Sequence, residues 1–359
     1  MTAPSPIVTD AVIIGAGPVG LFQVFQLGLH GIKCHVIDAL PHLGGQCAQL
    51  YPDKPIYDIP GVLMCTGAQL VEQLQQQIRP FGAIFHLGHE VASLAQHPAD
   101  GLFDLATNRG LALRAKVVIV AAGVGAFQPR KLKLEGLDRF EGRQLWHHAP
   151  PAEQLAGQRV VIVGGDDDAV RAALALSEPA ASPRPVQVTL VHRRDVFNGD
   201  DASLATLRER IASNAVKFVA GQAIGFETTP APEDRLGSLE VLGPDAQTRS
   251  VPCDALLVLQ GLSPRLGPVA EWGLALERKQ VVVNPATFES STPGVFAVGD
   301  INTYPGKRKL ILCGFHEATL AAFAAAALVH PDQPVQLQYT TTSPRLHQLL
   351  GVSGGTPSH

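Results

Sequence analysis

Residues 10–38 read DAVIIGAGPVGLFQVFQLGLHGIKCHVID, and this stretch decides the fold. A short apolar strand runs into a turn whose three glycines each allow something that a side chain would obstruct. Gly15 permits the tight turn, Gly17 lets a phosphate approach the backbone, and Gly20 lets the following helix lie close to the strand. The pattern therefore predicts a strand, a glycine turn and a helix in immediate succession.

The same stretch is typical of a dinucleotide site. The amino end of the predicted helix would present free amide groups and a partial positive charge to a pyrophosphate. A second apolar strand ends at Asp38, whose carboxylate is suitably placed along the chain to accept hydrogen bonds from an adenosine ribose. Because strand, helix, strand and terminal acid occur in this order, we expect a bound dinucleotide; the alternative is a purely structural βαβ unit.

The composition is that of an ordinary globular protein with room for two or three domains. The chain has 359 residues, of which 46% are hydrophobic and 17% charged, which excludes a disordered chain and gives no indication of a membrane span. A net charge of -4 disfavours nucleic acid and anionic lipid as partners. The opening residues, MTAPSPIVTD, contain neither a basic leader nor an unbroken apolar stretch, so we expect a cytoplasmic protein.

Cysteine spacing argues against metal or dithiol chemistry. The five cysteines are far apart and form no CxxC pair, so we expect no metal site. They are Cys34, Cys47, Cys65, Cys253 and Cys313. Cys47 follows two glycines and a glutamine; we interpret it as a buried thiol, with a catalytic thiol as the alternative.

The chain then supplies a second copy of the first layout. Short alternating segments between residues 83 and 120 predict an antiparallel meander that returns to a buried strand. An apolar strand at 159–163, a turn GGDDDA and a strand at 186–191 repeat the βαβ unit, and a second meander follows at 216–258. This predicts an α/β protein with two Rossmann-like nucleotide-binding domains, the second inserted into the first. We place the first domain at 1–123 and 263–345, the second at 124–262, and a C-terminal tail at 346–359.

The block STPGVFAVGD at 291–300 returns the chain to the first domain. It contains a turn, a strand of four apolar residues and a glycine that frees the backbone before an acid, so that Asp300 could reach a polyol chain. An alanine-rich helix at 317–329 follows Gly314, and its amino end could face an electron-rich group.

Six segments together resemble the thioredoxin-reductase-like ferredoxin–NADP reductases, which are homodimeric FAD enzymes. These segments are GAGPVG, LGGQC, AQLYPDKPIYDIPG, STPGVFAVGD, YPGKRKLILCGFHEA and YTTTS. The resemblance spans nearly the whole chain and implies two three-layer domains of the pyridine nucleotide-disulfide oxidoreductase type. Where a thioredoxin reductase would carry its CxxC, this chain has LWHHAP at 145–150, so dithiol chemistry is disfavoured.

The resemblance also implies the flavin-binding residues. Gly15, Gly17 and Gly20 would hold the FAD pyrophosphate and Asp38 its ribose. The remaining positions are Gln46 and Tyr51 beside the isoalloxazine, Val91 at the adenine, Phe127 near the domain crossover, Asp300 at the ribityl chain, and Tyr339 and Thr341 over the flavin across the dimer. Ordinary core packing is the alternative for Tyr51 and Phe127, and a helix cap is the alternative for Asp300.

We interpret His316 and Glu317 as helix-start residues, with proton donors as the alternative. No catalytic side chain is needed, because the flavin carries the chemistry.

The second glycine turn departs from the family pattern. The family reads GGGDSA where this chain reads GGDDDA, so Asp166 follows Gly164 and Gly165 in place of a glycine. At ~4 Å and an effective dielectric constant of about 20, repulsion of a phosphate is on the order of 4 kcal/mol per charge pair, unless the side chain turns away. We expect Asp167 and Asp168 to add to it.

Basic residues follow the next strand. His192, Arg193 and Arg194 match the cluster that binds the 2'-phosphate of NADPH, with a solvated strand end as the alternative. The family often has one more arginine, at the position of Asn198.

Two hypotheses follow. In the first, the protein oxidises NADPH through FAD and passes electrons to ferredoxin or a flavodoxin. In the second, Asp166 disables the nucleotide site, and the protein is a flavin-binding sensor or scaffold. The candidate docking residues for an acidic carrier are Arg130, Lys131, Lys133, Lys307, Arg308 and Lys309.

Overall fold

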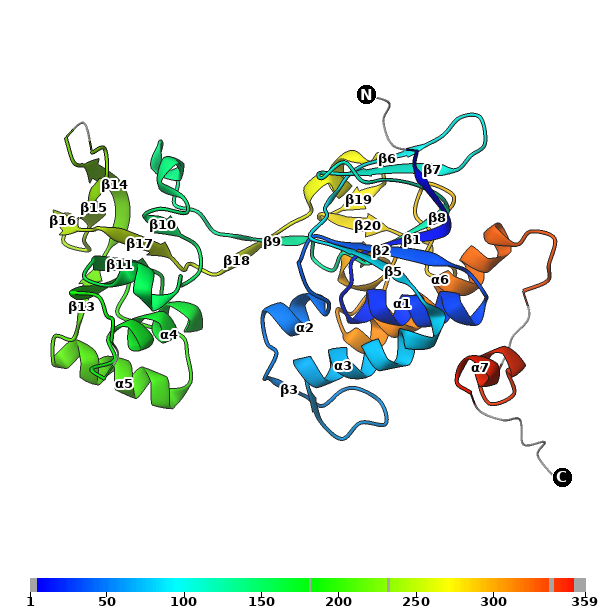
Figure 1. The fold of residues 1–359 in the computed structure, drawn as a ribbon, viewed down its shortest axis with the longest axis horizontal. Coiled ribbons are helices and arrows are strands. Elements are labelled where there is room, and N and C mark those ends of the chain that lie inside the picture. Colours follow the sequence, from blue (N-terminus) through cyan, green and yellow to red (C-terminus); the bar gives the residue numbers. More distant parts are fainter. Residues whose placement is uncertain (1–4, 181, 231–232, 336–338, 352–359) are drawn as a thin grey trace. The chain divides into compact units, whose positions relative to one another are not determined.

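The computed structural model describes residues 5–180, 182–230, 233–335 and 339–351, without the side chains of residues 126–128 and 262–265. The chain divides into two units (Figure 1). The first comprises the chain up to Ala126 and from Pro264 onward, and the second runs from Phe127 to Ser263. The second unit is inserted into the first, so the predicted two-domain α/β fold is confirmed.

A seven-stranded sheet forms the centre of the first unit (Figure 1). Its order is β5-β2-β1-β8-β7-β6, and β21 pairs with β8. β5, β2, β1 and β8 are parallel, β21 is parallel to β8, and β7 and β6 continue the sheet antiparallel. The strands are β1 (Ile7–Ile14), β2 (Cys34–Asp38), β5 (Ile84–Leu87), β6 (Val91–Gln96), β7 (Phe103–Thr107), β8 (Ala112–Val120) and β21 (Val295–Ala297). The carboxyl ends of β1, β2 and β8 meet at one edge, where the glycine turn lies.

One sequence interpretation is wrong in this sheet. The segment from residue 83 was expected to open an antiparallel meander, but β5 pairs in parallel with β2, and only β6, β7 and β8 form the meander. Alternating apolar residues indicate a strand without indicating its neighbour.

The helices α1 and α6 contact strands of the first unit's sheet, and α3 packs beside α1 (Figure 1). α1 (Pro18–Leu29) packs against both α3 (Gly67–Ile78) and α6 (Ile311–Val329). α3 begins with a capping box, in which Thr66 Oγ1 accepts from the Gln69 amide at 3.2 Å and the Gln69 side chain accepts from the Thr66 amide at 2.9 Å. The smaller elements are α2 (Gly45–Gln49), β3 (Pro55–Ile56), β4 (Cys65–Thr66), β19 (Leu276–Glu277), β20 (Gln280–Val282), β22 (Asn302–Thr303) and α7 (Pro344–Leu349).

α6 begins at Ile311, well before the expected start at 317. By length and apolar composition it is the one helix within the described ranges that could cross a membrane. A stripe of its alanines is fully buried, and the helix packs on α1. α6 therefore serves as a core helix of the first unit.

The second unit has its own sheet and core. Five parallel strands lie in the order β10-β17-β11-β12-β13, with α4 (Asp167–Leu176) and α5 (Asp201–Ala212) packed together. The strands are β10 (Leu145–Trp146), β11 (Arg159–Val163), β12 (Gln187–His192), β13 (Val216–Ala220) and β17 (Ala255–Val258). A three-stranded antiparallel sheet of β14 (Gln222–Thr228), β15 (Leu236–Leu242) and β16 (Thr248–Pro252) matches the middle of the meander predicted at 216–258. The prediction is wrong for the two ends of that segment, because β13 and β17 are parallel strands of the five-stranded sheet. The two connecting segments pair as β9 (Ala126–Pro129) and β18 (Leu262–Arg265).

Candidate functional site

The first glycine turn is packed so closely that two of its glycines have no room for a side chain. Gly15 has φ +110°, and a Cβ on it would lie 2.4 Å from the carbonyl oxygen of Ala121. A Cβ on Gly20 would lie 1.9 Å from the Gly15 carbonyl oxygen. Gly17 differs, because the nearest heavy atom to a Cβ there is the Cα of Gly45 at 3.9 Å. Open space therefore lies beside Gly17, at the amino end of α1, where the sequence predicts a pyrophosphate.

The carboxylate of Asp38, at the end of β2, is hydrogen-bonded to this turn. One oxygen accepts from the Ala16 amide at 2.6 Å and the other from the Leu40 amide at 2.8 Å. Burial raises the pKa of Asp38, and the two backbone hydrogen bonds oppose that rise. The sequence did not predict this structural role. A carboxylate has about four lone-pair sites, so the geometry still leaves capacity for a ribose hydroxyl.

Gln46 and Cys47 lie on α2, and Tyr51 follows it. The side-chain amide nitrogen of Gln46 lies 3.1 Å from the Cβ position of Gly123, just beyond β8. The Cys47 thiol and the Tyr51 hydroxyl are 3.7 Å apart. Burial raises the pKa of both groups, so the thiol stays protonated near neutral pH. Cys47 is a buried free thiol, as the sequence interpretation expects.

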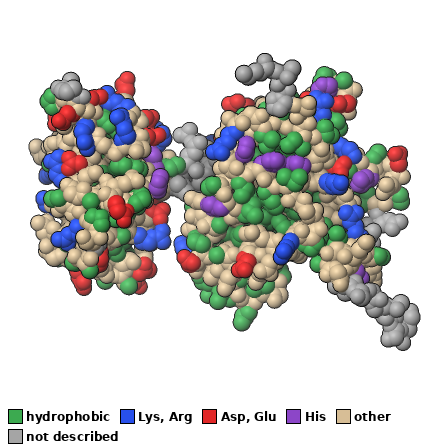
Figure 2. Space-filling view, viewed as in Figure 1, with side chains coloured by type: hydrophobic (Ala, Val, Ile, Leu, Met, Phe, Trp, Pro, Cys, Tyr) green, Lys and Arg blue, Asp and Glu red, His purple; other side chains and the backbone are tan. Residues whose placement is uncertain are grey.

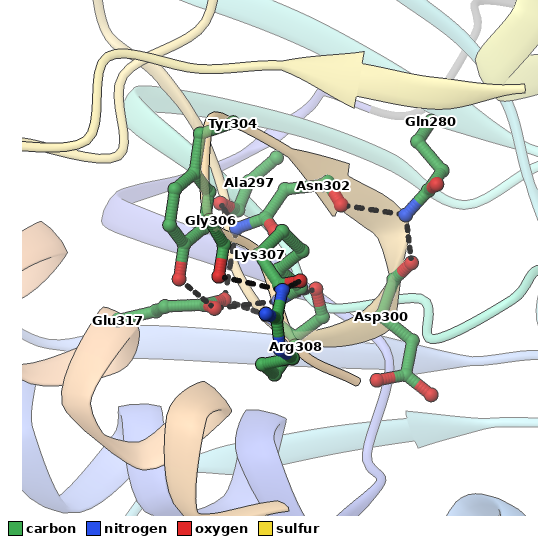
Figure 3. Close-up of polar contacts among 10 residues, drawn as sticks. Gln280, Ala297, Asp300, Asn302, Tyr304, Gly306, Lys307, Arg308 and Glu317 are labelled. Atoms are coloured by element: carbon green, nitrogen blue, oxygen red, sulfur yellow. Dashed lines mark hydrogen bonds and ion pairs between the residues drawn. The ribbon is translucent and has the colours of Figure 1, made fainter. Parts of the chain in front are cut away.

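Asp300 lies in a short 3-10 helix, η5 (Gly299–Ile301), directly after β21. Gly299 has φ +80°, and its Cβ position is 3.4 Å from Val19 in the glycine turn, so the two loops are in contact. Gln280 donates to the backbone carbonyls of Asp300 at 3.1 Å and Asn302 at 2.7 Å. The Asp300 carboxylate points away from these contacts (Figure 3) and accepts no hydrogen bond from any residue the structure describes. Burial raises its pKa, whereas Lys307 and Lys309 lower it.

A buried polar network, which the sequence did not indicate, lies beside Asp300 (Figure 3). The Glu317 carboxylate, on α6 and fully buried, accepts four hydrogen bonds. One oxygen accepts from the Gly299 amide at 2.7 Å and Asn302 Nδ2 at 2.8 Å. The other accepts from the Tyr304 hydroxyl at 3.0 Å and Lys307 Nζ at 2.5 Å. Lys307 Nζ also donates to the Gly299 carbonyl at 2.9 Å.

This network corrects two interpretations. Lys307 is not a docking cation, because its side chain is only 7% exposed and paired with Glu317. His316 and Glu317 are not helix-start residues, because α6 begins at Ile311 and places both in its second turn. The signal that could have revealed the pair is a lysine that follows Tyr-Pro-Gly, ten residues before a glutamate in an otherwise apolar helix.

The remaining predicted flavin residues are spread over the first unit and its connections. Val91 is buried at the start of β6. Tyr339 is 66% exposed, and Thr341 is also exposed, shortly before α7. Phe127 lies on β9, and its side chain is outside the described residues.

In the second unit, most of the predicted nucleotide residues border one cavity of about 470 Å³. A Cβ on Gly164 would lie 1.9 Å from the Leu259 carbonyl oxygen, and one on Gly165 would lie 2.6 Å from the His192 ring, so this turn also requires glycine. Among the residues that line the cavity are Gly164, Gly165, Asp166, His192 and Arg193. Arg130, Lys131 and Lys133, from the beginning of the second unit, line it as well. Arg194 is exposed and does not line it. The sequence did not predict the contribution of residues 130–133 to this cavity.

Asp166 is the amino-terminal cap residue of α4 but makes no capping hydrogen bond. Its Oδ1 accepts from Asn198 Nδ2 at 3.2 Å, and its Oδ2 lies 2.9 Å from the Cβ position of Gly261. Asp167 and Asp168 pair instead with Arg171 and do not line the cavity. The expectation that all three acids oppose a phosphate is therefore wrong for these two.

In the basic cluster of His192, Arg193 and Arg194, the protonation of His192 depends on burial and on neighbouring charges. Burial and Arg193 lower the pKa of His192, and Asp166 opposes this. A histidine with a lowered pKa is neutral at physiological pH. The arginines, not His192, are therefore the cations that this end of β12 offers to a phosphate.

Comparison with known proteins identifies this architecture. The family model of the pyridine nucleotide-disulphide oxidoreductases matches residues 9–322. Among solved structures, the Lactococcus lactis thioredoxin reductase shares the fold, with a TM-score of 0.60 and 20% identity, covering 90% of this chain and 99% of that one. The bacillithiol disulfide reductase of Staphylococcus aureus has a TM-score of 0.62 and 16% identity, covering 91% of this chain and 100% of that one. The chain belongs to the pyridine nucleotide-disulphide oxidoreductase family.

Sequence relatives narrow this class. A protein of Paracidovorax citrulli named ferredoxin–NADP reductase is 57% identical over 97% of this chain and 98% of its own length. Another of that name, from Methylibium petroleiphilum, is 55% identical over 97% of this chain and 93% of its own length. Within the family, the chain is thus an oxidoreductase of the ferredoxin–NADP reductase group.

Proposed function

We propose that this protein is an FAD-dependent ferredoxin–NADP(+) reductase that takes a hydride from NADPH and passes single electrons to ferredoxin or a flavodoxin. The proposal rests on one observation: over nearly its full length, more than half of the residues of this chain are identical to those of proteins with that name. The chain also has no CxxC pair. A bound flavin supplies the chemistry, because it accepts a hydride and releases electrons singly. The protein's task is therefore to bind, orient and shield.

The first unit offers a consistent set of groups for FAD. We propose that the pyrophosphate lies beside Gly17 at the amino end of α1, held in place by the turn of Gly15 and Gly20, with the ribose at Asp38. The free carboxylate of Asp300 suits the hydroxyls of the ribityl chain, and Gln46 and Tyr51 suit the ring system. Val91 is proposed for the adenine and Phe127 for the wall near the domain crossover.

The assembly is also part of the proposal. The outer faces of α1 and α6 carry half-buried aromatic residues, with the rings of Phe22 and Phe315 4.7 Å apart and those of Phe22 and Phe25 5.8 Å apart. Such a face favours contact with a second copy, and we propose a cytoplasmic homodimer. The exposed Tyr339 and Thr341 of each protomer would then cover the flavin of its partner.

Docking of an acidic carrier would require exposed basic side chains. On the face in Figure 2, Lys and Arg side chains are scattered rather than gathered. We propose that Arg308 and Lys309, both exposed, contact an acidic carrier. Lys131 is paired with Glu141 at 2.5 Å, and Arg130 and Lys133 border the nucleotide cavity.

Anaerobic mixing of the purified yellow protein with NADPH tests the function directly. We expect the flavin absorbance to bleach within seconds, because nothing in the proposed site requires a further reactant. NADH is the comparison nucleotide and should act more slowly. Unchanged absorbance with both nucleotides would instead favour a flavin-binding sensor whose nucleotide site is disabled by Asp166.

Replacing Arg193 should weaken NADPH binding selectively. A guanidinium at the cavity edge can bind the 2'-phosphate, and because Arg193 is exposed we expect only about a fivefold loss for Arg193→Ala, on the order of 1 kcal/mol. NADH, which lacks that phosphate, should be unaffected. Calorimetric titration with both nucleotides measures this, with Arg184→Ala as control, since Arg184 bonds the Pro179 carbonyl and is not among the lining residues. If Arg193→Ala lowered the affinity for NADH as much as the affinity for NADPH, Arg193 would not be the residue that binds the 2'-phosphate.

A further inference from the structure

The Glu317 carboxylate is surrounded only by hydrogen-bond donors. The Gly299 amide, the Asn302 amide group, the Tyr304 hydroxyl and the Lys307 ammonium all point at its two oxygens. A glutamine in the same place would offer one accepting oxygen and would direct its own NH2 group at two of these donors. The site therefore specifies a carboxylate and not merely a polar residue of that size.

All four donors come from residues 299–307, the segment that carries Asp300. Lys307 also donates to the Gly299 carbonyl, so both the amide and the carbonyl of Gly299 are bonded to the buried pair. The hydrogen bond from Lys307 to Gly299 joins the two ends of this segment, and its four hydrogen bonds to α6 all go to the Glu317 carboxylate (Figure 3). The position of Asp300 thus depends on Lys307 and Glu317, although neither donates to or accepts from its side chain.

The same segment is in contact with the first glycine turn. The Gly299 Cβ position is 3.4 Å from Val19, and a Cβ on Gly314 of α6 would lie 2.4 Å from Val19. The turn at Gly299, the start of α6 and the glycine turn therefore meet around one valine. A shift of the network would change the separation between Asp300 and the open space beside Gly17.

Stability alone does not account for this arrangement. A buried ion pair is often no more stabilising than apolar residues of similar volume. The network also leaves Asn302 Oδ1 buried with no partner among the described residues, which is a cost. The orientation of that amide is set by its NH2 group, which donates to Glu317 and to the Ala297 carbonyl at 2.8 Å.

We propose that Lys307 and Glu317 are positioning residues for the flavin, holding Asp300 and the Gly299 turn at the distance from the glycine turn that the cofactor needs. This inference rests on the proposed flavin site. If the proposal holds, some variants of these two residues should lose affinity for FAD although their folded structure remains stable.

The affinity of the apoprotein for FAD, measured by fluorescence titration, provides the test. Lys307→Met and Glu317→Gln should each weaken FAD binding about tenfold or more, because each leaves a buried charge or donor unpaired beside the turn. Tyr304→Phe removes a single donor and should cause a smaller loss. Lys116→Met is the matched control: it breaks the ion pair between Lys116 and Asp10, which are 2.8 Å apart, but Lys116 is 44% exposed, and FAD affinity should change less than about twofold.

A double variant separates positioning from packing. In Lys307→Met/Glu317→Leu, both charges are gone and apolar side chains fill the space, so the unfolding midpoint should recover relative to the single variants. FAD affinity should stay low, because the hydrogen bonds that Glu317 and Lys307 make to the amide and the carbonyl of Gly299 are lost. Recovery of both quantities, or single variants that fold and bind FAD like the unmodified protein, would overturn the proposal. An unmodified protein that binds no FAD would instead remove the proposed function.

Discussion

Gly17→Ala should fold normally and lose most of its flavin. The backbone at Gly17 is extended, with φ -70° and ψ 179°, which alanine adopts readily, and a Cβ there meets nothing closer than 3.9 Å. The added methyl group would occupy the space in which the pyrophosphate approaches the amides of α1. Forcing a methyl group into a close contact costs up to about 3 kcal/mol, so we expect FAD affinity to fall about 100-fold. The flavin-to-protein ratio after purification and an apoprotein titration measure this.

The control for this prediction is Gly20→Ala. Its Cβ would lie 1.9 Å from the Gly15 carbonyl oxygen, so α1 could not pack on β1, and the protein should fail to fold. Circular dichroism separates the two outcomes: native-like spectra for Gly17→Ala and lost structure for Gly20→Ala. If Gly17→Ala retains stoichiometric flavin with unchanged affinity, the pyrophosphate does not pass this glycine.

Features that depend on local sequence were predictable, and the glycine turn is the clearest example. The spacing of Gly15, Gly17 and Gly20 indicates how strand, turn and helix must meet, because each steric demand acts within a few residues. The apolar runs likewise indicate buried strands. The resemblance to a known family, rather than spacing, supplied Tyr339 and Thr341.

Features that depend on a distant partner were not predictable. Lys307 reads as a surface cation until α6 brings Glu317 to it, and β5 reads as part of a meander until β2 pairs with it. A one-dimensional pattern records the character of a residue and not its neighbour in space. The same holds for Asp38, whose contact with Ala16 spans 22 residues.

The proposed nucleotide site contains a fourth such partnership, between Asp166 and Asn198. The two residues are 32 positions apart, and their side chains are 3.2 Å apart at the edge of the cavity. The sequence shows an unfavourable acid and a missing arginine as separate departures. The structure joins them: the amide that replaces the arginine binds one oxygen of the carboxylate and thereby restrains it.

Asp166→Gly should therefore strengthen NADPH binding. The carboxylate borders the cavity beside Gly164 and Gly165, and its repulsion of a phosphate at ~4 Å is on the order of 4 kcal/mol before its orientation is considered. Because Asn198 holds one oxygen, we expect about half of this, ~2 kcal/mol, or a gain of about 30-fold in affinity. Glycine is tolerated as a helix cap and Asp166 makes no capping bond, so stability should change by only a few tenths of a kcal/mol. Calorimetric titration with NADPH measures the gain, which should shrink at high salt.

A double-mutant cycle decides whether the carboxylate and its restraint by Asn198 are responsible. Asn198→Ala should weaken NADPH binding when Asp166 is present, because the freed carboxylate can turn toward the phosphates, and should have no effect in the Asp166→Gly background. Asp168→Asn is the matched control, since Asp168 pairs with Arg171 outside the cavity and its loss should leave affinity unchanged. No gain in Asp166→Gly would show that the nucleotide phosphates bind away from this turn, and an equal effect of Asn198→Ala in both backgrounds would show that Asn198 does not act through Asp166. If the phosphates bind away from this turn, the basic side chains of residues 130–133, which also line the cavity, would be the remaining candidates for holding them.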